Sequence, residues 1–472
     1  MEAYGPNLKL KHSLGARRPA HLAWLVLGRR LDAPPPVPLS TDPLLLPRRA
    51  PAFGSDAAMA SPAAPIPDHQ APLPLPTVTD EILEDILLRL PTPTDLARAS
   101  TACASFRRII TDRSFLRRFR VLHPPPLLGF VNRQGFHPAE PPHPSAPLAG
   151  ALAGAADFSY TFVPTGRWIE PWRARDVRQG RVLIECVPEF TVADAEKFSL
   201  RDLELAVCDP LFRRYVLLPS IPEGLTAPLA RPFDFESFLA PTAEDEDETS
   251  FRVICTAWND TTLFAFVFSS ITGEWNLAAS PSFSSLDTSP PHYYNEFTSF
   301  CFVGNCIYWT RPWVDKLLVL DSLSMEFSVV NSVPSSNLRQ DNLKSHVVAG
   351  ENETPLILFL SDRNEDVSGD HLHIAKLNVS EPADQWKLEK IIPLPRQYSY
   401  SIICADKEFL FLQGIPKEYQ NSRFPWEEYP FREYFSLDTK TSELKRICGK
   451  KRYFFDARPY FGFPPSLSEP CI

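Results

Sequence analysis

Apolar residues recur at helical spacing between residues 80 and 90. The positions that share one helical face are Ile82, Leu83, Ile86, Leu87 and Leu90. Asp80 and Glu81 open the segment, where the helix dipole favours carboxylates, and Pro91 ends it. The pattern therefore predicts one amphipathic helix with a single apolar face.

Two further helices are predicted directly after this one. The run Thr92-Pro93-Thr94-Asp95 offers an N-cap hydroxyl, a proline at the first helical position and a carboxylate at the third. The helix that follows carries Leu96, Ala99 and Cys103. Thr111-Asp112 can cap a third helix, whose buried side has Phe115, Leu116, Phe119 and Leu122. So short a segment cannot bury all of this apolar surface within itself, so a partner is expected.

From residue 157 onward the apolar pattern changes to short strands, and a repeat is visible. An apolar strand ends in a small polar residue, and an aromatic or apolar residue opens the next strand six positions later. This spacing runs from Asp209 to Tyr215, Ser269 to Trp275, Asp321 to Phe327 and Asp438 to Leu444. A longer turn runs from Asn378 to Trp386. Because these turns recur every 52 to 60 residues, the pattern indicates stacked or radial units.

Upstream strands complete each unit. In the third unit, for example, two strands flank a turn at Gly304-Asn305. Four antiparallel strands are the content of one propeller blade, so residues 157–472 are predicted to form a β-propeller of about five to six blades. The apolar runs at 127–131 and 452–463 can pair to close the ring or make a sixth blade. A pair of β-sandwiches is the alternative.

Proline is abundant and unevenly spread, with 50 prolines against 18 glycines. Residues 1–73 are rich in proline without apolar periodicity, so we expect them to be disordered. Within them lies an apolar run flanked by arginines at 17–30, and an organelle transit segment is an alternative reading of it. The run is too short to span a bilayer. Residues 123–156 are rich in proline and alanine and are predicted to be a linker.

Charge and cysteine usage narrow the class of protein. A net charge of −9 and a pI of about 5.7 argue against a nucleic-acid binder. The nine cysteines form no CxxC pair, which favours reduced, buried thiols and a cytosolic or nuclear location. Cys301 and Cys306 have no matching pair of ligands to complete a zinc site, and His371 and His373 offer only two.

The sequence contains no set of residues typical of a catalytic centre. It has no GxSxG elbow, no GxxxxGK loop and no GxGxxG turn. The acidic run Glu244 to Glu248 lacks the spacing of a calcium loop and indicates a solvated loop. Several arginines between 107 and 120 are interpreted as a cationic flank of the helices. We therefore expect a protein that is not an enzyme, with no catalytic residue, metal or cofactor.

Three residues are candidates for contact with a target protein. Arg311, Trp313 and Trp426 fall outside the strand pattern, and tryptophan and arginine are common interface anchors. The alternative is that they only pack loops.

The helical segment resembles an F-box, whose usual form has an acidic pair, an apolar helix ending Arg-x-Pro, an Asp-Leu pair and a cysteine followed by an aromatic and a basic residue. The matching positions are Asp80, Glu81, Ile82, Leu83, Ile86, Leu87, Arg89, Leu90, Pro91, Asp95, Leu96, Cys103, Phe106 and Arg107. In two departures, Val78-Thr79 replaces the usual Leu-Pro and Phe106 the usual tryptophan. The later repeats are similar to the kelch-like, F-box-associated propellers of plant proteins.

The resemblance implies an α+β multidomain chain in which a small three-helix F-box at 74–122 precedes an all-β propeller. It implies a substrate-recognition subunit of an SCF-type ubiquitin ligase, bound to a Skp-family adaptor and through it to a cullin. The adaptor-binding residues would be Ile82, Leu83, Ile86, Leu87, Leu90, Pro91, Leu96 and Phe106. The alternatives are an adaptor-bound scaffold that promotes no degradation and a propeller that binds a carbohydrate or other ligand. No nucleic-acid or membrane partner is expected.

Overall fold

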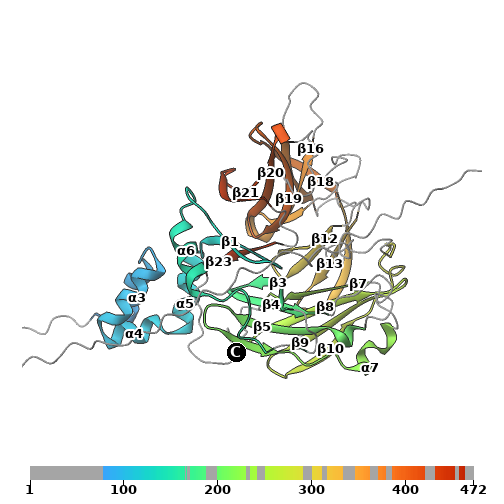
Figure 1. Ribbon diagram of the computed structural model, residues 1–472, viewed down its shortest axis with the longest axis horizontal. Coiled ribbons are helices and arrows are strands. Elements are labelled where there is room, and N and C mark those ends of the chain that lie inside the picture. Colours follow the sequence, from blue (N-terminus) through green and yellow to red (C-terminus); the bar gives the residue numbers. More distant parts are fainter. Residues whose placement is uncertain are drawn as a thin grey trace, which may run out of the picture. The chain divides into compact units, whose positions relative to one another are not determined.

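The computed structural model describes two compact units, which divide between Phe119 and Arg120 (Figure 1). The described residues are 78–164, 166, 171–187, 199–229, 234–241, 250–290, 300–310, 316–332, 346–361, 370–378, 385–419, 431–451 and 457–462. The segment 1–73, which we expected to be disordered, lies outside them.

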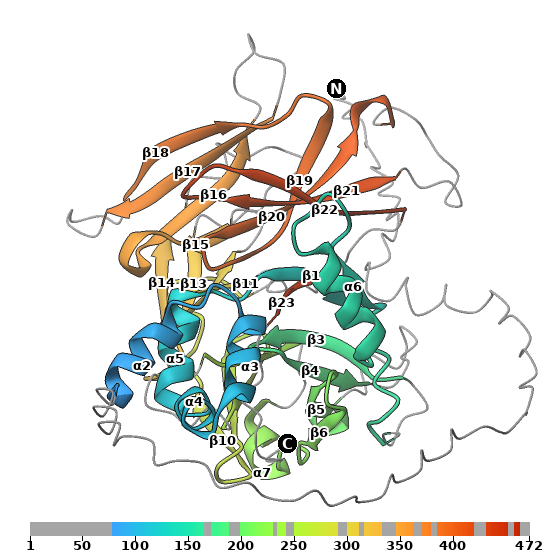
Figure 2. The same cartoon turned by 90° about the vertical axis from the view of Figure 1, so that its left-hand side faces the viewer.

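Within the described residues, the first unit contains four helices where the sequence predicted three. They are α2 (Asp80–Leu88), α3 (Pro93–Ala102), α4 (Ala104–Ile110) and α5 (Arg113–Leu122) (Figure 2). The predicted second helix is split because Cys103 has an extended backbone, with φ −156° and ψ 164°. The Cys103 thiol then caps α4, since its Sγ accepts the Phe106 N–H at 3.5 Å.

Side-chain caps set where these helices begin, as the sequence predicted. The Thr92 hydroxyl accepts the backbone N–H of Asp95 at 3.1 Å and so caps α3. An Asp112 carboxylate oxygen accepts the N–H groups of Ser114 at 2.9 Å and Phe115 at 3.2 Å at the start of α5. Each cap satisfies donors that a helix terminus otherwise leaves unpaired.

The core of the helical unit is small and apolar. Its buried members are Leu87, Leu88, Leu96, Ile109, Ile110, Phe115 and Phe119. The rings of Phe115 and Phe119 stack with their centroids 6.2 Å apart, on the predicted buried side of α5. One side of each helix therefore packs inward.

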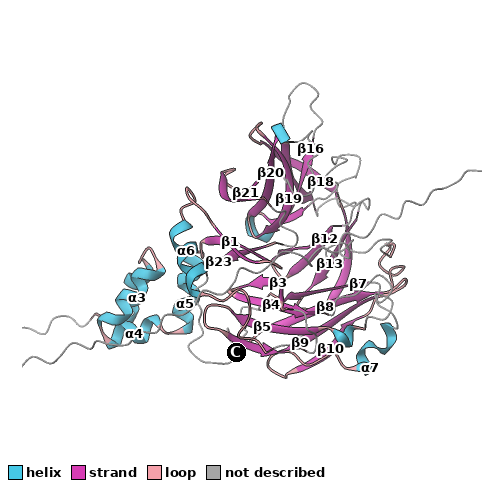
Figure 3. Cartoon of the chain, in the orientation of Figure 1, coloured by secondary structure: helices cyan, strands magenta, loops and turns pink. Residues whose placement is uncertain are grey.

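The second unit is a six-bladed β-propeller, as predicted (Figure 3). Five blades have four antiparallel strands, of which the first lie at the centre and contact one another. Blade 1 has β3 (Arg173–Arg178), β4 (Arg181–Cys186), β5 (Glu204–Asp209) and β6 (Arg214–Leu217). Blade 2 has β7 (Asp234–Leu239), β8 (Arg252–Trp258), β9 (Leu263–Ser269) and β10 (Glu274–Ala279). Blade 3 has β11 (Phe300–Val303), β12 (Cys306–Thr310), β13 (Lys316–Asp321) and β14 (Glu326–Asn331).

The next two blades follow the same order. Blade 4 has β15 (His346–Ala349), β16 (Pro355–Ser361), β17 (His371–Asn378) and β18 (Gln385–Pro393). Blade 5 has β19 (Tyr398–Asp406), β20 (Phe409–Pro416), β21 (Arg432–Asp438) and β22 (Leu444–Lys450). The short helical segments are α7 (Glu223–Thr226), η2 (Leu200–Asp202), η3 (Ala227–Leu229), η5 (Glu351–Glu353) and η6 (Lys417–Tyr419).

The repeat seen in the sequence is the hairpin between the third and fourth strands. In three blades the turn aspartate accepts two backbone N–H groups, and for Asp321 these belong to Leu323 at 2.8 Å and Ser324 at 3.2 Å. The same bonds occur at Asp209 and Asp438. Four residues after each turn residue the backbone is left-handed, at Arg213, Gly273, Met325 and Ser442. The aspartate thus provides an Asx turn that fixes the hairpin register.

The two ends of the propeller sequence close the ring in a three-stranded sixth blade. Its strands are β1 (Leu127–Asn132), β2 (Gly135–Pro138) and β23 (Arg458–Phe461), with Val131 opposite Arg458. This corrects the prediction that residues 123–156 are a linker, because they form β1, β2 and α6 (Ala146–Ala155). Their alanines serve close packing, since Ala139 and Ala149 are buried against the sheet.

One carboxylate joins the closing blade to blade 5. Glu140 accepts the Gly449 N–H at 3.1 Å and contacts the Lys450 ammonium at 2.8 Å and the Arg446 guanidinium at 3.4 Å. These contacts connect residues about three hundred positions apart in sequence and so hold the ring closed.

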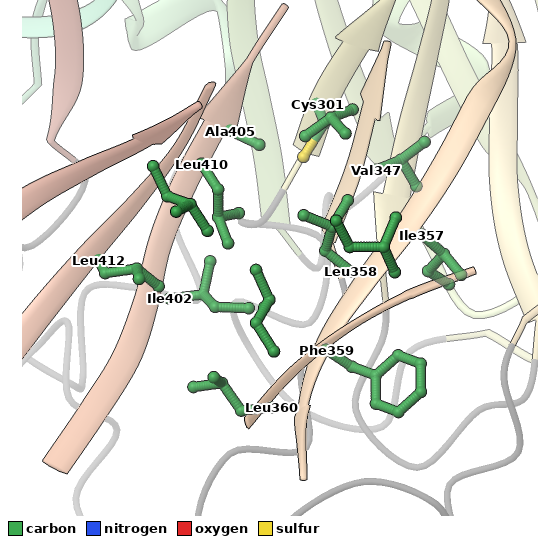
Figure 4. Close-up of a cluster of buried hydrophobic side chains, with 14 of the residues drawn as sticks. Cys301, Val347, Ile357, Leu358, Phe359, Leu360, Ile402, Ala405, Leu410 and Leu412 are labelled. Atoms are coloured by element: carbon green, nitrogen blue, oxygen red, sulfur yellow. The ribbon is translucent and has the colours of Figure 1, made fainter. Parts of the chain in front are cut away.

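The cores lie between neighbouring blades. Figure 4 shows one of them, where Ile402, Leu410 and Leu412 of blade 5 gather with Val347 and Leu358 of blade 4. Apolar clusters of this kind lie between successive blades around the propeller.

Candidate functional site

An exposed apolar stripe runs along α2 of the helical unit. The exposed fractions are 51% for Val78, 53% for Ile82 and 53% for Ile86. Ile82 and Ile86 are four apart and share one side of the helix, and Val78 lies just before the N-cap residue Thr79. Large apolar residues aligned in this way indicate a surface that a partner covers.

The predicted adaptor-binding residues fall into two groups. Ile82, Ile86 and Pro91 are exposed, and Leu83, Leu90 and Phe106 are half-buried. Leu87 and Leu96 are only 3% and 5% exposed and belong to the core. In the free chain Leu87 and Leu96 therefore pack inward, and their contact with an adaptor remains a prediction.

Ion pairs hold α2 against the helices behind it. The Asp80 carboxylate lies 2.6 Å from the Arg108 guanidinium, and the Glu84 carboxylate lies 2.6 Å from the Arg118 guanidinium. The hydrogen bond to Asp80 raises the pKa of Arg108. Arg118 also lies 3.6 Å from Asp85. The arginines interpreted from sequence as a cationic flank therefore include two that fix the orientation of α2, and so of its exposed stripe.

The predicted target-contact residues Arg311, Trp313 and Trp426 lie outside the described residues, so their role remains a prediction. Two described tryptophans connect neighbouring blades. The Trp275 indole N–H donates to the Pro219 carbonyl at 2.7 Å, from the outer strand of blade 2 to the end of blade 1. The Trp386 indole N–H donates to the Asn331 carbonyl in the same way between blades 4 and 3.

Charged side chains that the sequence analysis missed lie on and beside the inner strands. Arg175 pairs with Glu236, with its Nε 3.5 Å from Glu185, and Arg458 lies 3.8 Å from Asp176. Burial raises the pKa of Asp176, and the nearby guanidinium of Arg458 opposes that rise. In the sequence, the alternating charges of the segment Arg173–Arg178 could have revealed these residues, because the segment forms a strand at the centre of the fold.

Arginine also stacks on aromatic rings in this region. The guanidinium carbon of Arg178 lies 3.8 Å from the centroid of Phe302, and that of Arg458 lies 4.1 Å from that of Phe300. These contacts connect blade 1 and the closing blade to blade 3. Paired and stacked guanidinium groups at the centre of the ring stabilise its packing.

Cysteine and histidine side chains form no cluster of metal-ligating groups in the part of the chain that the structure describes. Cys301 faces Tyr308 across the hairpin, and Cys306 faces Val303, so the two cysteines are not opposite one another. Burial raises the pKa of Cys301 to about 11. His373 stacks on Phe359 with a centroid distance of 5.1 Å, and burial lowers the pKa of its imidazole.

Among the described helices, none is both long and apolar enough to cross a membrane.

Comparisons with known proteins identify the helical segment. A scan against protein families matches the F-box-like family at residues 80–121. A search of curated proteins found no match.

Solved structures show only distant likeness. The tricorn protease is 11% identical, with 60% of this chain and 27% of that chain covered and a TM-score of 0.30. Saccharomyces cerevisiae Sqt1 is 10% identical, with 57% and 58% covered and a TM-score of 0.30. An alpha-L-arabinofuranosidase from Clostridium thermocellum is 12% identical, with 59% and 95% covered and a TM-score of 0.27. This chain thus spans about a quarter of the tricorn protease, and scores this low carry no argument about fold or function.

Proposed function

We propose that this protein is the substrate-recognition subunit of an SCF-type ubiquitin ligase. The support is an F-box-like domain at residues 80–121 that precedes a six-bladed β-propeller. In this role the F-box binds a Skp-family adaptor, which connects it to a cullin. The propeller binds the target protein.

The observation that carries the proposal is the exposed stripe of Val78, Ile82 and Ile86 within the F-box match. Water contacts about half of each side chain in the free chain. An adaptor that covers the stripe removes this apolar surface from water, which favours association. The ion pairs of Asp80 and Glu84 hold α2 in place beforehand, so little further ordering is needed on binding.

The proposed subunit does no chemistry itself. Holding a target beside a ubiquitin-charged enzyme raises the effective concentration of its lysines, and this needs no catalytic residue in the receptor. The central arginines and carboxylates contact one another between neighbouring blades, which supports a packing role for them. We further propose a cytosolic or nuclear location, supported by the lack of a disulfide among the eight described cysteines.

The test is co-expression of the full chain with a Skp-family adaptor, followed by affinity capture and size-exclusion chromatography. We expect a stoichiometric complex that also captures cullin. Proteins bound through the propeller should gain ubiquitin in a reconstituted reaction that contains cullin, RING protein and charged conjugating enzyme. A complex that captures targets without modifying them would favour a scaffold, and the absence of any adaptor complex would refute the proposal.

A further inference from the structure

The outer strand of blade 4 differs from those of the other blades in length. β18 spans 9 residues, whereas β6, β10, β14 and β22 span between 4 and 7. It is the last strand of its sheet, so one of its backbone edges pairs with no other described strand (Figure 2). The five consecutive residues from Lys387 to Ile391 are exposed. Such an edge offers N–H and C=O groups to another extended chain.

Three lysines lie on one side of this edge. Lys376 on β17 is directly opposite Lys387 on β18, and Lys390 is opposite Ile374, two residues before Lys376. The register shift leaves Glu389 as an extra residue, which keeps Lys387 and Lys390 on the same side. Like charges directly opposite one another repel, so a bound anion relieves a cost that is already present in the free sheet.

Ion pairs distinguish these lysines from three basic residues of the neighbouring blade. On β22 of blade 5, Arg446 and Lys450 both pair with Glu140, and Lys445 pairs with Glu443. Within the described residues, Lys376, Lys387 and Lys390 form no ion pair and are all exposed. A chain with a net charge of −9 therefore carries, at this edge, three exposed lysines that form no ion pair among the described residues, with Glu389 as the bulged residue between two of them.

The same strand also carries exposed apolar side chains next to the lysines. Leu388 is 49% exposed and Ile391 is 44% exposed. A strand added to β18 would place alternate side chains on the two faces of the sheet, one face beside the lysines and the other beside Leu388. The surface therefore fits a chain in which carboxylates alternate with apolar β-branched residues.

We propose that β18 binds an extended acidic polypeptide segment by β-strand addition, with Lys376, Lys387 and Lys390 pairing with its carboxylates. The site belongs to the propeller unit, so its binding can be measured apart from adaptor binding. The opposing explanation for lysines on an exposed edge is that they only prevent association of sheets.

The probe is a fluorescein-labelled ten-residue peptide of alternating glutamate and valine, titrated with the full chain and followed by fluorescence anisotropy. We expect saturable binding that weakens as salt rises, because the charges are exposed. The triple variant K376E/K387E/K390E should bind at least about tenfold more weakly, which is about 1.4 kcal/mol. The matched control K440E/K445E/K451E changes the net charge equally but on blade 5, and should bind like the wild type.

A second pair of probes tests the backbone contact. Versions N-methylated at alternate residues, in both registers, keep every charge, and in one register they lose the N–H groups that pair with β18. We expect one of the two to lose binding. Equal loss of binding in both triple variants, or undiminished binding of both methylated peptides, would show a non-specific charge effect and overturn the proposal. Absence of saturable binding to the wild type would overturn it as well, and adaptor capture by the same preparation would leave the F-box function standing.

Discussion

Two adjacent residues of α2 allow adaptor binding and folding of the helical unit to be tested separately. Ile86 is 53% exposed, whereas Leu87 beside it is 3% exposed and packs in the helical core. The same change to aspartate at each position should therefore have different consequences. We expect Ile86→Asp to leave the unit folded and weaken adaptor binding, and Leu87→Asp to unfold it.

The magnitudes follow from burial. Fully burying an isoleucine contributes about 1.5–3 kcal/mol, so the exposed half of Ile86 can contribute roughly half of that on binding. Desolvating a new carboxylate in the same contact adds at least about 1 kcal/mol more. The total loss of about 2 kcal/mol or more corresponds to a roughly 30-fold rise in the dissociation constant. At Leu87, loss of the buried side chain alone costs about 2–5 kcal/mol, and a buried carboxylate without a partner adds to it.

The assay is calorimetric titration of each variant with the purified Skp-family adaptor. Helix content is measured in parallel by circular dichroism, and protease resistance of residues 78–119 by limited proteolysis. Ile86→Ala is the graded control, because it removes the apolar surface without adding charge and should give a smaller loss. Wild-type affinity in Ile86→Asp would refute the assignment of the exposed stripe. A protease-resistant Leu87→Asp unit would refute the packing argument.

Three further predictions concern stability and reactivity. Thr92→Ala removes the cap of α3 and should destabilise the helical unit by about 1 kcal/mol, measured by thermal unfolding. Burial alone would raise the pKa of Glu140, but the Lys450 ammonium and the Gly449 N–H outweigh it and lower the pKa. The Glu140 contribution to propeller stability should therefore be complete above its unfolded pKa and be lost as pH falls through the lower folded value, and denaturant unfolding of wild type and Glu140→Gln should converge there. Cys103 is exposed and should react with iodoacetamide in the native chain, whereas buried Cys255, whose pKa burial raises to about 12, should react only after unfolding.

Each of these has a control. Thr101→Ala, at an exposed position near the end of α3, should change stability by less than about 0.5 kcal/mol. A Glu140→Gln difference that persists unchanged into acid would contradict the ion-pair account. Rapid native labelling of Cys255, located by peptide mass mapping, would contradict its burial.

The sequence by itself determined the elements whose signals are local. Thr92 and Asp112 cap their helices through bonds to residues two or three positions away, so short segments encode them. The turn aspartates at 209, 321 and 438 likewise bond within their own turns, and their regular spacing revealed the repeated blade. The apolar runs at 127–131 and 452–463 also allowed a pairing that closes the ring, and β1 and β23 do pair.

Tertiary structure decided what depends on neighbours distant in sequence. Helical periodicity marks Ile86 and Leu87 as equally apolar, and only packing against the other helices shows which one is buried. The proline- and alanine-rich run before residue 156 looked like a linker because its buried contacts come from β23 and blade 5. The sequence could not show the lysine cluster at β18 either, because Lys376 and Lys387 become neighbours only through the register between β17 and β18.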